Sequence, residues 1–222
     1  MFLRLNHLAM NQNSQKNYWN KLAPTKEFTT NLDFNLLNPL SKDAKIVDYG
    51  CGYGRTLNQL YKAGYHNLTG FDFSEAMIQR GKNEFPHLKL KIIEENHTKC
   101  DSDSVDMVIL FALLTCVVED KAQQKMMREI HRILKPGGRV YINDFLLNDD
   151  ERNRLRYNRF EKQYGTYGIF ELPDGGLLRH YDENYLKQLM EGFTQEYFKK
   201  TVFTTMNGHQ SNGFVMVAKK EG

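Results

Sequence analysis

Cysteine is scarce in this chain of 222 residues, which contains only Cys51, Cys100 and Cys116. Their number is odd and no two of them have C-x-x-C spacing, so the sequence predicts neither a disulfide framework nor a zinc site. We expect no bound metal. Unpaired cysteines are typical of a reducing compartment, which favours a cytoplasmic location.

Long apolar runs and a large excess of one charge are also missing. No apolar stretch reaches the roughly 18 residues that a membrane-spanning helix needs. The first eight residues, MFLRLNHL, are too short and too polar for a signal sequence. The formal net charge is only +3, which is too small to indicate a nucleic-acid partner by itself. We therefore expect neither a membrane nor a nucleic acid as a partner, and the oligomeric state stays open.

The composition is that of an ordinary globular domain. Hydrophobic residues make up 41% of the chain and charged residues 26%, and the length suits one α/β domain with a small lid. Neither an internal repeat nor a low-complexity tract is found. The sequence therefore predicts a single domain over residues 1–222.

Strand and helix patterns alternate through the middle of the chain. Apolar runs predict strands at 45–49, 67–72, 88–94, 105–110 and 139–145, separated by helices at 54–63, 74–84 and 120–134. Two further strands, at 195–204 and 213–219, are predicted to pair antiparallel at one edge. The pattern indicates an α/β fold with a Rossmann-like, doubly wound sheet of seven strands, mostly parallel, with an antiparallel C-terminal edge hairpin.

Two segments lie outside this alternation. Apolar residues at three- and four-residue spacing predict helix from residue 14 to about residue 39. Residues 146–180 are too many for an ordinary connection, and they contain a run of arginines at positions 152–159. This run forms either a solvated helix face, the interpretation that we prefer, or a site for an anionic substrate carboxylate or phosphate.

The segment IVDYGCGYGR, residues 46–55, carries the strongest functional signal. A strand runs into alternating glycines, where a ligand can approach the backbone and the first N–H groups of the next helix. Asp72 ends the following strand, where a carboxylate can accept hydrogen bonds from ribose hydroxyls. A dinucleotide fingerprint G-x-G-x-x-G beginning at Gly50 would need glycine where Arg55 stands. The turn therefore predicts a nucleoside cofactor that is not a dinucleotide.

Four motifs in this order resemble the class I S-adenosylmethionine-dependent methyltransferases. They are D-x-G-x-G-x-G at 48–54, Asp72, VDMV at 105–108 and EIHRILKPGG at 129–138. The resemblance covers roughly residues 40–145 and implies S-adenosyl-L-methionine as the cofactor and methyl transfer to a small-molecule acceptor. It also implies that residues 14–40 form an N-terminal helical cap and that residues 146–180 form an insertion acting as a substrate lid.

The resemblance also implies the residues of a cofactor site. Gly50 and Gly52 would flank the methionine part, Asp48 would bind its ammonium group, and Asp72 would hold the ribose diol. The complete expected set is Asp48, Gly50, Cys51, Gly52, Asp72, Phe73, Met77, Glu94, Glu95 and Phe111. Core packing explains Phe73, Met77 and Phe111 equally well, and which of the two glutamates would serve the adenine amine stays open.

Candidate residues for the chemical step are fewer. His180 follows a glycine-rich turn and is the best acid–base candidate, and Tyr18, next to Trp19, would fold over the cofactor and shield the methyl group from water. Cys116 faces either the substrate or the core. Each of these residues also has a purely structural interpretation.

The acceptor is not named by these motifs. A sulfonium methyl group is already activated, so such enzymes chiefly align donor and nucleophile and need a base only for a protonated nucleophile. An RNA or protein methyltransferase, or a catalytically inactive cofactor-binding partner subunit, remain the alternatives. The Asn/Asp-Pro-Pro-Tyr motif of amino-directed DNA enzymes is absent, since FALL stands at 111–114.

Overall fold

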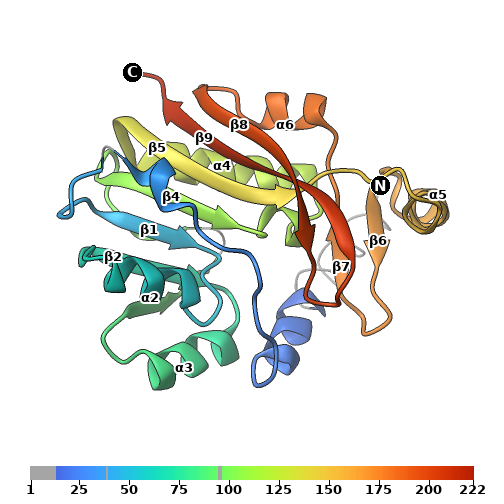
Figure 1. The fold of residues 1–222 in the computed structure, drawn as a ribbon, viewed down its shortest axis with the longest axis horizontal. Helices are drawn as coiled ribbons and strands as arrows, with labels where there is room; N and C mark the ends of the chain where they lie inside the picture. Colours follow the sequence, from blue (N-terminus) through green and yellow to red (C-terminus); the bar gives the residue numbers. More distant parts are fainter. Residues whose placement is uncertain (1–13, 39, 95–96) are drawn as a thin grey trace.

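The computed structural model describes residues 14–38, 40–94 and 97–222 (Figure 1). Its centre is a seven-stranded sheet with the order β3-β2-β1-β4-β5-β9-β8. The strands are β1 (Ile46–Tyr49), β2 (Leu68–Asp72), β3 (Lys89–Ile92), β4 (Val105–Phe111), β5 (Leu134–Phe145), β8 (Phe193–Thr204) and β9 (Gln210–Lys220). The first five run parallel, whereas β9 is antiparallel to both β5 and β8. The predicted doubly wound α/β sheet with an antiparallel edge hairpin is confirmed.

Helices cover both faces of this sheet. They are α2 (Arg55–Lys62), α3 (Glu75–Glu84), α4 (Asp120–Ile133) and α6 (Glu183–Leu189). Because side chains alternate along a strand, one buried strand supplies two cores. In β4, Met107 belongs to the core that includes Leu57 of α2, and Val108 belongs to the core that includes Ile130 of α4. The near-continuous apolar run of β4 is thus explained by burial on both sides.

The N-terminal segment is helical over a shorter range than predicted. It is helical over residues 14–22 and again in the short 3-10 helix η1 (Phe34–Leu37), but residues 26–33, here called the bridging segment, are not helical. Pro24 lies two residues after Leu22, the last helical residue, and cannot continue the backbone hydrogen bonding of a helix. Thr29 then donates its hydroxyl to the carbonyl of Thr204, 3.0 Å away. In this segment, contact with the end of β8 outweighs the helical pattern of apolar residues in the sequence.

Strand β5 also begins earlier than predicted. Leu134 already pairs with Val105, and the register then shifts before Met107 pairs with Arg139. The residues K-P-G-G therefore belong to an irregular strand start and not to a loop. Helix α4 ends at Ile133, as the following proline and glycines require.

The insertion, residues 146–180, has a regular structure of its own. Helix α5 (Glu151–Tyr164) is followed by the antiparallel hairpin of β6 (Ile169–Glu171) and β7 (Leu177–Arg179), which the sequence did not predict. Figure 1 shows this unit beside the end of the β8–β9 hairpin. Thr115 donates its hydroxyl to the carbonyl of Arg179 at 2.9 Å, so the insertion is fixed to the carboxyl end of β4.

Candidate functional site

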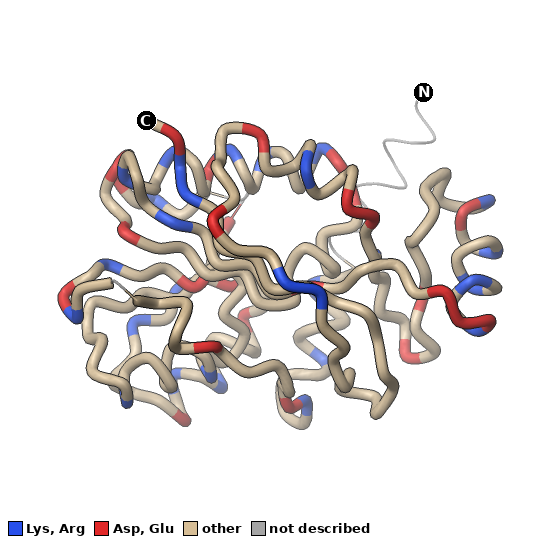
Figure 2. The backbone as a smooth tube through the Cα atoms, turned by 45° about the horizontal axis from the view of Figure 1, so that its top comes forward, with Lys and Arg blue, Asp and Glu red and all other residues tan. Residues whose placement is uncertain are grey.

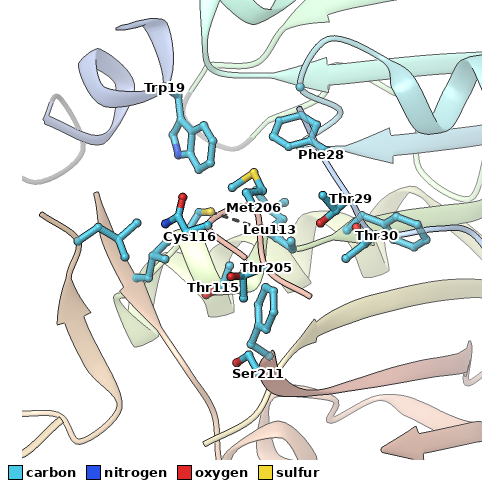
Figure 3. Close-up of a pocket in the computed structure, with 18 of the residues that line it drawn as sticks. Trp19, Phe28, Thr29, Thr30, Leu113, Thr115, Cys116, Thr205, Met206 and Ser211 are labelled. Carbon is cyan, nitrogen blue, oxygen red and sulfur yellow. Dashed lines mark hydrogen bonds between the residues drawn. The ribbon is translucent and has the colours of Figure 1, made fainter. Parts of the chain in front are cut away.

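A cavity of about 1360 Å³, its open mouth included, lies at the carboxyl ends of β1, β2 and β4. This edge is where open α/β sheets bind ligands. Besides these strand ends and residues 111–116, the cavity is lined by the helix of residues 14–22, the bridging segment, the glycine turn (residues 50–54), the insertion and the β8–β9 turn (residues 205–209). Figure 3 shows Trp19 and Phe28 pointing from two of these parts toward Met206 of the β8–β9 turn.

Three positions of the glycine turn require a residue without a side chain. Gly50, Gly52 and Gly54 have φ values of 84°, 54° and 87°, which side chains strongly disfavour. A Cβ on Gly52 would stand 2.4 Å from the ring of Phe28, and one on Gly50 would stand 2.6 Å from Leu113. The amides of Gly50 and Cys51 both donate to the carbonyl of Phe71, at 2.7 and 2.9 Å. The turn is therefore tied to the end of β2 and closely surrounded.

Asp48 is a buried carboxylate with an unused oxygen. Its side chain is 2% exposed, and its Oδ1 has no hydrogen-bond partner among the described residues. Burial, and then the charge of Asp72, raise the pKa of Asp48 to about 7. An orphaned carboxylate oxygen facing a ligand cavity is costly unless a cation or donor completes it. The position fits the expected ammonium group.

Arg55 lies beside the same turn and also has a buried polar atom without a partner among the described residues. One of its terminal nitrogens donates to the carbonyl of Thr30, but its Nε is buried and has no hydrogen-bond partner in the described part of the chain. Burial lowers its pKa, and its charge in turn lowers that of Asp48. Two neighbouring groups of opposite charge, each with an unsatisfied atom, match the ammonium and carboxylate of an amino acid. Sequence reasoning used Arg55 only to exclude a dinucleotide and missed this role.

Asp72 lies between the glycine turn and a second cavity. Its Oδ2 accepts from the amide of Gly52 and its Oδ1 from the amide of Ser74, both at 2.8 Å. Burial raises its pKa to about 6. Each carboxylate oxygen has a further lone pair, so both can still accept hydrogen bonds from vicinal hydroxyls. The two amides fix the orientation of the carboxylate.

The second cavity, of about 1250 Å³ with its open space, lies beyond Asp72. Phe73 and Glu94 line it, and Glu94 is exposed. Glu95 lies outside the described residues. Met77 and Phe111 line the first cavity instead. Met77 is almost fully buried, and Phe111 packs edge-on against Tyr141, so these two serve the core as well as the cavity wall.

His180 lines the first cavity from the end of β7 and is 5% exposed. Its Nδ1 lies 2.6 Å from the hydroxyl of Tyr157 and 3.1 Å from Nδ2 of Asn148. The amide nitrogen of Asn148 also lies 3.0 Å from the carbonyl of Leu146, which assigns that atom as the donor. We therefore assign Nδ1 of His180 as an acceptor and place the ring proton on Nε2.

The environment of His180 keeps its imidazole neutral. Burial, followed by the positive charges of Arg156 and Arg152, lowers its pKa to about 3. Both side-chain hydrogen bonds of the ring with the described residues are at Nδ1. The sequence predicted an acid–base residue. The geometry instead indicates a neutral imidazole with its N–H at Nε2, in a residue that lines the cavity.

Tyr18 closes the cavity from the other side. Its hydroxyl lies 3.3 Å from both carboxylate oxygens of Asp174 in the β6–β7 turn, and burial followed by the charge of Asp174 raises its pKa. Gln15 of the same helix donates to the carbonyl of Leu177 at 3.0 Å. The helix of residues 14–22 is thereby joined to the insertion, which suits the predicted shielding role of Tyr18 better than proton transfer.

Cys116 borders both cavities. Burial raises the pKa of its thiol well above the ordinary value, and Sγ donates to the carbonyl of Ala112 at 3.3 Å. A protonated thiol is a poor nucleophile.

In the part of the chain that the structure describes, no group of three potential metal ligands comes together. No helix of residues 14–38, 40–94 or 97–222 has the length and apolarity that crossing a bilayer requires.

Known proteins share this arrangement. A family model described as "Methyltransferase domain" matches residues 46–138, which include the glycine turn and Asp72. A crystal structure of a SAM-dependent methyltransferase from Methanosarcina mazei superposes with a TM-score of 0.81 at 26% identity, covering 86% of this chain and 99% of that chain.

Curated relatives differ in the reactions that their names describe. A carboxy-S-adenosyl-L-methionine synthase of Nautilia profundicola is 29% identical over 160 residues, 69% of this chain and 68% of that protein. The human tRNA N(3)-cytidine methyltransferase is 29% identical over 174 residues, 72% of this chain and 41% of that protein. The chain spans less than half the length of several of its curated relatives, including that tRNA enzyme.

Proposed function

Because the chain belongs to the class I S-adenosylmethionine-dependent methyltransferases, we propose that it transfers the methyl group of S-adenosylmethionine to a small-molecule acceptor. The observation that carries this proposal is one cavity that reaches from the glycine turn to His180. Its lining runs without a break from the glycine turn and Asp72 to Phe170 and His180. The methionine end of the cofactor and a second small molecule would therefore meet in one cavity.

The residues around the glycine turn fit the cofactor that this family uses. Asp48 and Arg55 would hold the ammonium and carboxylate of its amino-acid end, and Asp72 would hold the ribose hydroxyls. Phe73 and Glu94 would border the adenine in the second cavity. The two orphaned atoms of Asp48 and Arg55 support this placement, because both would gain the partner that they lack.

The protein's own contribution to the reaction would be alignment and exclusion of water. Bound S-adenosylmethionine supplies a methyl group that is already activated on a sulfonium. The helix of residues 14–22, the bridging segment, the β6–β7 turn and the β8–β9 turn are here called the roof of the cavity. Three contacts join these parts: Tyr18 with Asp174, Lys26 with Asn207 and Thr29 with Thr204. A closed, dry site raises the effective concentration of the nucleophile and prevents hydrolysis.

The same roof favours a small acceptor over a macromolecule. The bridging segment and the β8–β9 turn meet above the cavity, so a folded RNA or protein would reach the methyl group only after these contacts open. Figure 2 shows acidic and basic residues interspersed along the backbone, without a basic stripe in the described part of the chain. The strong phosphate attraction on which RNA binding depends is therefore unsupported.

Transfer from methyl-labelled S-adenosylmethionine tests this proposal. The protein is incubated with a metabolite extract, unfractionated tRNA and a cell protein extract, and label is counted in each fraction. We expect label in the small-molecule fraction alone. Label in tRNA or protein would replace the proposal with one of its rivals. Absence of transfer despite tight binding of S-adenosylhomocysteine would indicate an inactive partner subunit.

A further inference from the structure

Helix α5 places two of its arginines, Arg152 and Arg156, in the lining of the cavity, whereas Arg154 and Arg159 do not line it. Of these four side chains only that of Arg156 is half-buried, and the other three are exposed. The sequence interpretation of this arginine run as a solvated face therefore holds for part of it only. Arg156 is the member whose position requires a separate explanation.

No ion pair among the described residues compensates the charge of Arg156. Its Nε is buried without a hydrogen-bond partner among those residues. Asp150 lies 4.0 Å from Arg152, which is itself 44% exposed. Burial lowers the pKa of Arg156, and the Tyr157 side chain and the charge of Asp150 offset only part of this effect. A half-buried guanidinium with an unpaired nitrogen gains a further partner when a ligand supplies an anion.

Arg156 and His180 converge on one aromatic ring. The guanidinium carbon of Arg156 lies 3.4 Å from the ring centroid of Phe170, and the imidazole of His180 packs edge-on against the same ring, with centroids 4.8 Å apart. Phe145 stacks on the other side of His180 at 5.5 Å. The guanidinium of Arg156 and the neutral imidazole of His180 thus contact the same aromatic ring at the cavity wall.

We propose that Arg156 and Nε2 of His180 bind a carboxylate of the methyl acceptor, which is therefore a small carboxylic acid with an apolar body. The half-buried positive charge of Arg156 and one neutral donor match a single negative charge, because Arg152, the other arginine that lines the cavity, lies 4.0 Å from Asp150. Arginine binds carboxylates through two parallel hydrogen bonds. The apolar body is matched by the side chains that line this part of the cavity, Phe145, Phe170, Leu172, Leu178 and Met206. The inference rests on the proposed methyl transfer, because it specifies the acceptor of that reaction.

The only tryptophan of the chain, Trp19, lines the cavity and reports its occupation. Its fluorescence can be followed during titration with sodium hexanoate, hexanamide and inorganic phosphate, each in the presence of saturating S-adenosylhomocysteine. We expect hexanoate to bind about tenfold more tightly than hexanamide, because only hexanoate satisfies the buried guanidinium. Equal affinities for hexanoate and hexanamide, no response to hexanoate, or preference for phosphate would overturn the proposal.

Variants of two arginines on the same helix localise the effect. Arg156→Gln should weaken hexanoate binding by about tenfold, whereas Arg159→Gln should leave it unchanged. Arg159 is the matched control because it also lies over an aromatic ring, Phe160 at 5.1 Å, yet does not line the cavity. Equal loss in both variants would overturn the proposal. If Arg156→Gln does not fold, Arg156→Lys keeps the charge, loses the paired donors and should show an intermediate affinity.

Calorimetry with S-adenosylhomocysteine separates this inference from the proposed function. Wild-type protein, Arg156→Gln and Arg159→Gln should bind it with the same affinity. Lost affinity in Arg156→Gln alone would assign Arg156 to the cofactor and overturn the inference. Failure of the wild-type protein to bind would instead refute the proposed function.

Discussion

The hydroxyl of Tyr157 and Nδ1 of His180 lie 2.6 Å apart across the wall of the cavity. Tyr157 is on α5 and His180 is at the end of β7, so this contact joins the two parts of the insertion. With Asn148 donating to the same nitrogen, the contact fixes the neutral tautomer whose proton is on Nε2. The ring that the sequence suggested as an acid or base is thereby held as a directional donor.

This tautomer predicts an unusual pH response for His180. Because burial, Arg156 and Arg152 lower its pKa to about 3, its ring should show no titration between about pH 8 and pH 5, where an ordinary histidine titrates near 6.5. The unfolded chain binds this proton first, so the contribution of His180 to the free energy of unfolding should decline as the pH falls from about 6.5 toward 3. Imidazole ¹⁵N and ¹³C shifts measure both tautomer and charge, and a titration near pH 6.5 would refute the assignment.

Removing the hydroxyl of Tyr157 should loosen this ring without affecting the cofactor site. Tyr157→Phe should lower the free energy of unfolding by about 1 kcal/mol, because one buried hydrogen bond is lost. Affinity for S-adenosylhomocysteine should not change. Tyr167→Phe is the control, since Tyr167 packs against the ring of Tyr157 and its hydroxyl has no hydrogen-bond partner among the described residues. Chemical denaturation measures the difference, and equal stability of the two variants would contradict the expected bond.

Asp48 should make cofactor binding depend on pH. Its pKa is raised to about 7, first by burial and then by Asp72, whereas an ammonium group beside it would favour the ionised form. Binding of S-adenosylhomocysteine at pH 6 should therefore release a proton from Asp48, and affinity should fall as the pH decreases below about 7. Calorimetry in buffers of different ionisation enthalpy measures this release. Asp48→Asn should abolish it, and an unchanged release in that variant would assign the proton elsewhere.

Arg55 should act on only one end of the cofactor. Arg55→Met removes the guanidinium while keeping an apolar stem, and we expect about tenfold weaker binding of S-adenosylhomocysteine, because a charge-assisted hydrogen bond is lost. Binding of 5′-methylthioadenosine, which lacks the amino-acid end, should be unaffected. Equal weakening for both ligands would show that the substitution disturbs the turn and not a carboxylate contact.

The glycine turn offers a test of close packing. Gly52→Ala introduces both a strained φ of 54° and a Cβ 2.4 Å from Phe28. Gly208→Ala introduces similar strain at φ 78°, but nothing lies within 4 Å of its Cβ. We expect Gly208→Ala to cost about 1 kcal/mol of folding free energy and Gly52→Ala to cost clearly more, with loss of cofactor binding. Thermal unfolding compares them, and equal costs would mean that Phe28 moves aside freely.

The parts of the structure that the sequence predicted correctly depend on local signals. Strand β1, the turn and α2 follow one another within residues 46–62, and their apolar periodicity and glycines determine their conformation without distant partners. The same holds for Ser74, whose side chain caps α3 by accepting from the amide of Met77 at 3.2 Å. Periodicity also identified β4 as a strand buried on both faces.

The parts that the sequence missed depend on contacts between distant residues. The bridging segment is held by Thr204, which is 175 positions from Thr29, and no local pattern contains that partner. The tautomer of His180 depends on Tyr157 and Asn148, which are 23 and 32 positions away. The division of the arginine run into exposed and cavity-lining members depends on where α5 packs. Such features can be identified only from the folded structure.

A crystal structure of the protein with S-adenosylhomocysteine tests the central claim most directly. The account predicts the ammonium of the ligand at Oδ1 of Asp48, its carboxylate at Nε of Arg55, its ribose at Asp72, and its sulfur facing the part of the cavity that contains Arg156 and His180. A ligand carboxylate bound to Arg156, or a ligand lying away from the glycine turn, would contradict both the cofactor site and the acceptor site described above.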